Sequence, residues 1–309
     1  MNRYFLKLIK RFSYHDIDIK RTYPLVRKAK DMVAVSPERL KYNILDLAIP
    51  SSLDGYQIPT RIFKPENADI NSSVIIFFHG GGWVTGNIDN YSKICAELSK
   101  HTSTVIISVD YRLAPEFKFP VGLTDCYDAT CVICENMESF GFKKENSVLM
   151  GDSAGGNLAA ALSLMLRDKN KFSPNKQILV YPSTYNIHNK NSPFRSVKAF
   201  GNDYVLTSKR ICDYMELYAE KQEDFSNPYF APLLEKNLSG QPDTLILTAW
   251  YDPLRDEGEE YGNKLAQFGN YVEIYRIFDT IHGFLILPSG SQQMSKAYRY
   301  INEFLNRRK

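Results

Sequence analysis

The pattern of apolar and polar residues alternates between strand-like and helix-like stretches from about residue 42 to the end of the chain. The run VIIFF at 74–78 is continuously apolar, β-branched and aromatic, which is typical of a buried strand. Comparable runs predict further strands at residues 42–48, 56–64, 104–109, 147–150, 177–181, 244–249 and 271–278. Helical periodicity predicts helices at residues 90–100, 121–139, 154–168, 257–268 and 292–306.

This alternation predicts an α/β fold. Strands that alternate with helices need crossover connections, which leave the strands parallel and cover both faces of the sheet. We therefore expect about eight strands in a mostly parallel sheet with helices on both faces. The first two runs meet around the turn-forming pair Asp54-Gly55, so they form a hairpin that supplies an antiparallel edge. Ligands of such sheets bind beyond the carboxyl ends of the strands.

Two segments do not follow the alternation. Residues 1–40 and 183–226 are too long to be simple connections between a strand and a helix. We interpret them as the N-terminal and middle parts of a helical cap over the site. Residues 41–182 and 227–309 then form the main α/β domain, in which the chemistry is expected.

The strongest chemical signal is GDSAGG at residues 151–156, with Ser153 at its centre. It follows a strand-like run and precedes an alanine-rich helical stretch, which is the strand, turn and helix context of a nucleophile elbow. Gly151 and Gly155 allow neighbouring backbone to pass without a Cβ clash. The positive end of the following helix lies behind the serine hydroxyl. This context predicts that Ser153 is a nucleophile rather than part of an ordinary Gly-Ser-Gly turn.

A serine nucleophile needs a base, and the chain has five histidines to compare. His15 lies in the N-terminal segment and His101 ends a surface-type helix. His188 lies in a polar tract, and His79 precedes three glycines. His282 follows the last predicted strand, where a loop can reach over the serine. After a nucleophile elbow the triad order is serine, then carboxylate, then histidine, and only His282 satisfies it.

The carboxylate that orients the histidine should follow the penultimate strand. Asp252 comes directly after the strand-like stretch that begins at Thr244, and it lies between the serine and the histidine in sequence. It would hold the imidazole in the reactive tautomer and stabilise its protonated form. We interpret Asp256 and Glu257 as residues that cap and charge the start of the next helix. Asp256 remains the alternative to Asp252.

The sequence HGGGW at 79–83 follows a predicted strand and supplies an oxyanion loop. Glycines expose their amides and allow the dihedral angles that converge these donors on one point. A phosphate-binding loop is the rival interpretation, but the sequence has neither a GK[ST] ending nor a GxGxxG pattern. We expect His79 and Gly80 to support the loop. The amides expected to bind the carbonyl oxygen belong to Gly81, Gly82 and Ala154.

These motifs recur together in one known family. The blocks are HGGGW at 79–83, YRLAPE at 111–116, GDSAGG at 151–156, DPLRDEG at 252–258 and HGF at 282–284. With these blocks in this order, the chain resembles the hormone-sensitive lipase family of esterases, also called bacterial family IV, from about residue 70 onward. The resemblance implies the α/β-hydrolase fold, the triad and oxyanion donors named above, a two-part cap, short acyl esters as substrates and no cofactor. Arg112 and Glu116 of YRLAPE are expected to form a charged network rather than to touch substrate.

The sequence therefore predicts a serine carboxylesterase that forms an acyl-enzyme intermediate with a small ester. An amidase or peptidase could use the same triad, and a non-catalytic small-molecule receptor could use the same fold. A lipase acting at lipid surfaces is suggested weakly by the basic N-terminus. The residues that shape the pocket lie in segments that match no family motif, so the natural substrate stays open.

Composition adds limits on partners. The net charge is +3, from 38 Lys and Arg against 35 Asp and Glu, which argues against a nucleic-acid partner. The lone CxxC pair, Cys131 and Cys134, has no second pair, so we expect no metal. No run approaches the roughly 18 apolar residues of a membrane span, and no signal peptide is recognisable. We expect a cytoplasmic protein, and an exposed last strand and helix would suit a homodimer. In the N-terminal segment, Phe5, Leu8, Ile9 and Phe12 fall at helical spacing. We interpret them as one face of a helix that packs onto its own protein, with a membrane surface as the alternative.

Overall fold

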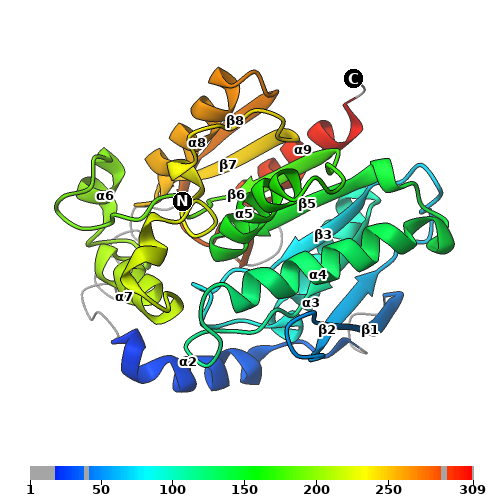
Figure 1. Ribbon diagram of the computed structural model, residues 1–309, viewed down its shortest axis with the longest axis horizontal. Helices are drawn as coiled ribbons and strands as arrows, with labels where there is room; N and C mark the ends of the chain where they lie inside the picture. The colour runs from blue at the N-terminus through cyan, green and yellow to red at the C-terminus, as the bar shows by residue number, and fades with distance from the viewer. Residues whose placement is uncertain (1–17, 38–41, 287–290, 308–309) are drawn as a thin grey trace.

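The computed structural model describes residues 18–37, 42–286 and 291–307, and Figure 1 shows their arrangement. The strands are β1 (Ile44–Pro50), β2 (Gln57–Phe63), β3 (Val74–Phe78), β4 (Val105–Val109), β5 (Ser147–Asp152), β6 (Lys176–Val180), β7 (Asp243–Tyr251) and β8 (Val272–Ile281). The α-helices are α2 (Ile19–Val33), α3 (Ile88–Thr102), α4 (Val121–Asn136), α5 (Ala154–Asp168), α6 (Arg195–Phe200), α7 (Ser208–Tyr218), α8 (Arg255–Gln267) and α9 (Gln292–Asn306). Short 3₁₀ helices lie at Met137–Phe140, Lys144–Asn146, Gln222–Ser226, Pro232–Leu234 and Phe284–Ile286.

Within the described ranges, the strands form one eight-stranded sheet in the order β1-β2-β4-β3-β5-β6-β7-β8. β2 pairs antiparallel with both β1 and β4, and every other pair is parallel. The predicted fold class, a mostly parallel sheet with an antiparallel edge hairpin, is confirmed. β3 and β5 lie side by side near the middle, so the loops that follow them meet at one edge of the sheet.

Helices cover both faces of the sheet, and alternate residues of each central strand point to opposite faces. On β3, Val74, Ile76 and Phe78 pack in one cluster with apolar residues of α4, α5 and α8. Ile75 and Phe77 pack in a second cluster with α3 and α9. All five side chains are buried. This double burial explains why the strand is continuously apolar, because neither face is exposed to water.

The N-terminal and middle segments that the sequence assigns to a cap lie close together in space. Figure 1 shows α2, in blue, beside α7, in yellow-green, away from the edge hairpin. Lys20 of α2 forms ion pairs with Glu216 and, at 3.6 Å, with Asp213, both on α7. Segments far apart in sequence therefore join on one side of the sheet, and their assignment as a cap stays a prediction.

No helix in the described part of the chain is long and apolar enough to cross a membrane. The four apolar residues of the amphipathic N-terminal pattern, Phe5, Leu8, Ile9 and Phe12, lie outside the described residues.

Candidate active site

Ser153 lies on a sharp turn between β5 and α5. Its backbone angles, φ 55° and ψ −117°, are unusual for a residue with a side chain and mark a strained elbow. A Cβ on Gly151 would lie 2.2 Å from the carbonyl oxygen of Gly155, and a Cβ on Gly155 would lie 1.9 Å from that of Phe78. Both positions therefore require glycine, and they hold the serine at the carboxyl end of the central strands.

The structure brings the predicted triad together. His282 Nε2 is 2.9 Å from Ser153 Oγ, and His282 Nδ1 is 2.8 Å from Asp252 Oδ2. An ionised carboxylate only accepts hydrogen bonds, so Nδ1 carries the proton and donates to Asp252, while Nε2 accepts from the serine hydroxyl. The Asp252 side chain is fully buried, and the His282 side chain is 11% exposed. This geometry suits a nucleophile, a base and an orienting carboxylate, the roles that the sequence predicts.

The ends of two neighbouring strands place the base and its carboxylate. Asp252 follows β7 directly, and His282 follows β8 directly. Tyr251 pairs with Ile281 across a local irregularity in the β7–β8 ladder, so the two functional residues leave the sheet at adjacent points. The second Asp252 oxygen accepts a 2.9 Å hydrogen bond from the Leu254 amide, which fixes the carboxylate.

The glycine loop after β3 adopts backbone conformations that residues with a side chain rarely adopt. Gly81 has φ 132° and Gly82 has φ 64°. A Cβ on Gly81 would lie 1.8 Å from the carbonyl oxygen of Thr85, and one on Gly82 would lie 2.5 Å from the Tyr214 ring. Gly81, Gly82 and Ala154 line the same cavity as Ser153. The three residues therefore border the same space as Ser153, and the role of their amides as an oxyanion hole stays a prediction.

His79 is buried beneath this loop and does not line the cavity. Its Nδ1 lies 2.9 Å from the Gly80 carbonyl oxygen, and its ring stacks on Tyr111 with centroids 4.4 Å apart. Burial lowers the pKa of His79 to about 4, so the ring is neutral at neutral pH. A neutral, stacked ring bonded to the loop backbone suits a residue that supports the loop, and this role stays a prediction.

Asp152 is a site residue that the sequence analysis did not single out, although it lies inside the GDSAGG block. Its carboxyl group accepts hydrogen bonds from the Gly80 amide at 2.8 Å, from Tyr91 Oη at 3.1 Å and from Tyr181 Oη at 3.2 Å. It therefore ties the nucleophile elbow to the glycine loop. Because the group is fully buried, desolvation raises the pKa of Asp152 to about 6, above its usual value of 3.8.

This shift predicts that Asp152 lowers stability as the pH rises. The folded protein holds the proton more tightly than the unfolded chain, so the contribution is fully present below pH 3.8 and is lost as the pH rises through about 6. The free energy of unfolding of Asp152→Asn minus that of the wild type should therefore increase by roughly 2 kcal/mol when the pH is raised from about 4 to about 7.5. Urea unfolding of both proteins at the two pH values measures this difference. An equal difference at both would contradict the prediction.

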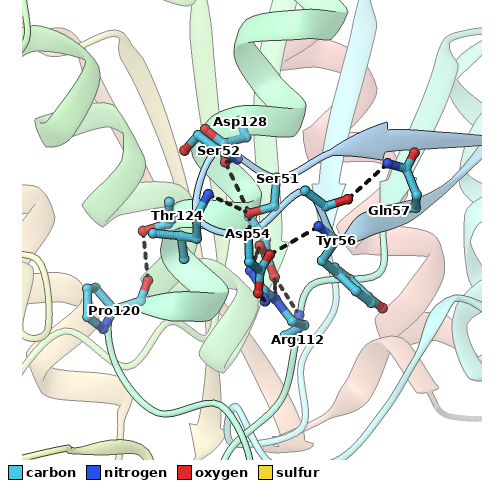
Figure 2. Close-up of polar contacts among 12 residues, drawn as sticks. Ser51, Ser52, Asp54, Tyr56, Gln57, Arg112, Pro120, Thr124 and Asp128 are labelled. Atoms are coloured by element: carbon cyan, nitrogen blue, oxygen red, sulfur yellow. Dashed lines mark hydrogen bonds and ion pairs between the residues drawn. The ribbon is translucent and has the colours of Figure 1, made fainter.

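Arg112, from the YRLAPE block, lies in a charged network away from the triad. It donates to Asp125 at 2.8 Å, to Asp54 at 2.6 Å and to Ser51 Oγ at 3.1 Å. Figure 2 shows Arg112 directed at the turn between β1 and β2, where Asp54 lies. Glu116 accepts from Arg27 of α2 at 2.9 Å. Neither Arg112 nor Glu116 lines the cavity that contains Ser153, and both form the charged contacts that the sequence predicts for them.

The prediction that Asp256 and Glu257 cap the helix after β7 is wrong in one respect. Both lie in the first turn of α8, but no side chain caps that helix. Glu257 is fully buried and accepts hydrogen bonds from the Thr184 amide at 2.7 Å and from His188 at 2.6 Å. The Asp256 carboxylate accepts from the Ser196 amide at 2.8 Å. The two carboxylates hold the segment after β6 against α8, and His188, from the polar tract, is a buried partner of Glu257.

A cavity of about 190 Å³ lies over the nucleophile. Its wall is largely apolar and is shared between the α/β domain and the segments around α2 and α7. Three charged residues line it in addition to the triad histidine: Lys30, Asp152 and Arg210. The apolar and aromatic side chains in its wall include Trp83, Tyr91, Ala154, Val205, Leu206, Ile211, Tyr214, Leu254 and Ile286.

Known proteins resemble this chain over most of its length. A family described as alpha/beta hydrolase fold matches residues 75–286. The chain is 37% identical to an arylesterase of Saccharolobus solfataricus over 244 residues, which cover 79% of this chain and 78% of that protein. It is 30% identical to an ethyl acetate hydrolase of Pseudomonas putida, over 85% of this chain and 82% of that protein. Among solved structures, an esterase of Pyrobaculum calidifontis superposes with a TM-score of 0.85 at 29% identity, covering 99% of this chain and 98% of that one.

Proposed function

The chain belongs to the hormone-sensitive lipase family of α/β-hydrolase esterases and is a carboxylic ester hydrolase, and from this premise we propose that it cleaves short acyl esters by a serine mechanism. Ser153 is the nucleophile, His282 the base and Asp252 the residue that orients the base. The observation that carries the proposal is the continuous hydrogen-bonded chain from Ser153 through His282 to the buried Asp252.

In the first half-reaction, Ser153 Oγ attacks the ester carbonyl carbon while His282 Nε2 takes the hydroxyl proton. The amides of Gly81, Gly82 and Ala154 bind the negative charge that develops on the carbonyl oxygen. The tetrahedral intermediate then expels the alcohol, which takes the proton from His282 and leaves an acyl-enzyme. In the second half-reaction, a water molecule attacks in the same way, and the carboxylic acid leaves with Ser153 restored.

The size of the cavity supports the preference for short chains. The cavity over Ser153 has a volume of about 190 Å³ and a largely apolar wall, which suits a small acyl group. A short acyl group fills such a space, whereas a long fatty acyl chain extends beyond it. The name of one relative, ethyl acetate hydrolase, points in the same direction.

The test is a panel of 4-nitrophenyl esters from acetate to palmitate, with matching 4-nitroanilides. We expect kcat/KM to peak at acyl chains of about six carbons or fewer and to be far lower for every anilide. A preference for long chains that rises above their solubility limit would favour a lipase. Comparable rates on the anilides would favour an amidase, and tight ligand binding without any ester cleavage would favour a receptor.

A further inference from the structure

Lys30 is the residue that connects the N-terminal helix to the candidate active site. It lies near the end of α2, far from the triad in sequence, yet its side chain lines the cavity that contains Ser153 and His282. Its ammonium group donates a 2.9 Å hydrogen bond to Thr85 Oγ1. A cation from the predicted cap therefore contributes to the wall of the cavity.

Lys30 differs from the other long cationic side chains of the helix whose contacts are described above. Lys20 pairs with Glu216, and Arg27 pairs with Glu116. Lys30 has no carboxylate within ion-pair distance among residues 18–37, 42–286 and 291–307, and its polar partner is the neutral hydroxyl of Thr85.

The two nearest acidic residues are engaged elsewhere. Asp152 lines the same cavity, but three donors of the protein bind its carboxyl group. Asp31, the next residue along α2, accepts hydrogen bonds from the side chains of Asn87 and Asn90 at 2.8 and 3.2 Å. Both carboxylates attract the charge of Lys30 at longer range, but neither forms an ion pair with it in the described part of the chain, so a carboxylate of a ligand could still bind the ammonium group directly.

Lys30 is half-buried, and this makes the arrangement costly in the absence of a ligand. Desolvation lowers the pKa of Lys30, because an ammonium group partly removed from water is disfavoured, and this outweighs the attraction of Asp152 and Asp31. An anionic group that enters the cavity would offset this cost and form a charge-assisted hydrogen bond.

The helix is held firmly where it carries Lys30. Arg27, one turn earlier, donates to the Val84 carbonyl at 2.7 Å and to the Ala114 carbonyl at 2.8 Å. Asp31, the residue after Lys30, accepts hydrogen bonds from Asn87 and Asn90. The ammonium group is therefore positioned before any substrate binds, which reduces the entropy lost on binding. Arg210 of α7 lines the same cavity and donates to the Val205 carbonyl at 2.6 Å.

We propose that Lys30 makes this cavity selective for esters that carry a carboxylate, and that its ammonium group binds that carboxylate while Ser153 attacks the ester. Substrates of this class include monoesters of dicarboxylic acids and acyl esters of hydroxy acids. The inference rests on the proposed function, because it assigns the substrate class of the same site.

Two matched pairs of substrates test the proposal. Mono-4-nitrophenyl adipate and 4-nitrophenyl hexanoate have acyl chains of equal length, and only the first ends in a carboxylate. In the second pair, 4-acetoxybenzoate carries its carboxylate on the alcohol side of the acetate ester, and its methyl ester is the neutral counterpart. For each pair, the ratio of kcat/KM for the charged ester to that for the neutral ester is measured in wild type, Lys30→Gln, Lys30→Arg and Lys28→Gln. Lys28 is an exposed lysine of the same helix and serves as the control.

We expect Lys30→Gln to lower this ratio about tenfold or more in at least one pair, Lys30→Arg to retain most of it, and Lys28→Gln to leave it unchanged. Thr85 Oγ1 also donates to the Gly81 carbonyl at 3.0 Å, so Lys30 could instead act on the oxyanion loop. In that case both members of each pair would lose activity equally, and the unchanged ratio would overturn the proposal. A ratio that changes in neither pair with activity intact overturns it as well. Failure of the wild type to cleave the neutral esters would instead overturn the serine esterase assignment itself.

Discussion

Replacing Ser153 with alanine should lower kcat for 4-nitrophenyl ester hydrolysis by about 10⁴-fold or more. The change removes the hydroxyl that donates to His282 and attacks the carbonyl, so no acyl-enzyme can form. What remains is the modest acceleration that an oxyanion hole and substrate binding provide to attack by water. Alanine also fits the elbow as well as serine does on steric grounds, so the fold should be retained.

Two measurements make this expectation specific to Ser153. The variant should no longer react with a serine-directed phosphonate, whereas in the wild type mass spectrometry should locate the adduct on the peptide that contains Ser153. Ser183→Ala is the matched control, because Ser183 also lines the cavity but His282 Nε2 is bonded to Ser153. That variant should change kcat by less than about tenfold. Comparable losses in both variants, or phosphonate labelling that persists in Ser153→Ala, would contradict the assignment.

Local sequence was sufficient where one interaction dominates the structure. The VIIFF run identified β3 because a strand buried on both faces must be apolar at every position. GDSAGG identified the turn at Ser153 because neighbouring backbone approaches Gly151 and Gly155 too closely for any Cβ. In both cases the constraint acts within a few residues of the motif and is visible in the residues themselves.

Sequence reasoning failed where burial depends on distant segments. From its position near the start of a predicted helix, Glu257 is expected to be an exposed acidic residue, and His188 lies among polar residues. Both become fully buried because the chain after β6 folds back over α8, and they then satisfy each other. Lys30 is a similar case: nothing in the sequence of α2 separates it from Lys28, and only packing of the helix beside the glycine loop gives it access to the cavity.

Asp152 shows an intermediate situation. The GDSAGG block names the residue, and its position before the nucleophile is clear from the sequence. The role of Asp152 is not clear from the sequence, because its partners Gly80, Tyr91 and Tyr181 come from three separate parts of the chain. A motif therefore states which residue types a site contains, while the contacts between motifs emerge only after folding.

The sequence leaves open whether Asp252 or Asp256 is the partner of the histidine. From the contacts of these two residues we expect very different effects when each is replaced. Asp252→Asn should lower kcat by about 10⁴-fold. One oxygen of Asp252 accepts from the Leu254 amide and the other from His282 Nδ1. If the asparagine oxygen keeps the Leu254 hydrogen bond, its NH₂ group faces Nδ1. That arrangement favours the tautomer in which Nε2 carries the proton and cannot accept one from Ser153.

Asp256→Asn is the matched control, because it makes the same chemical change four positions later. The Asp256 carboxylate binds the Ser196 amide and the Arg255 side chain. Its loss should reduce the free energy of unfolding by about 1 kcal/mol and leave kcat within about tenfold of the wild type. Steady-state kinetics and urea unfolding of the two variants decide between the residues. A large loss of kcat in Asp256→Asn with near-normal activity in Asp252→Asn would transfer the orienting role to Asp256, and would require the hydrogen bond between His282 and Asp252 to be catalytically idle.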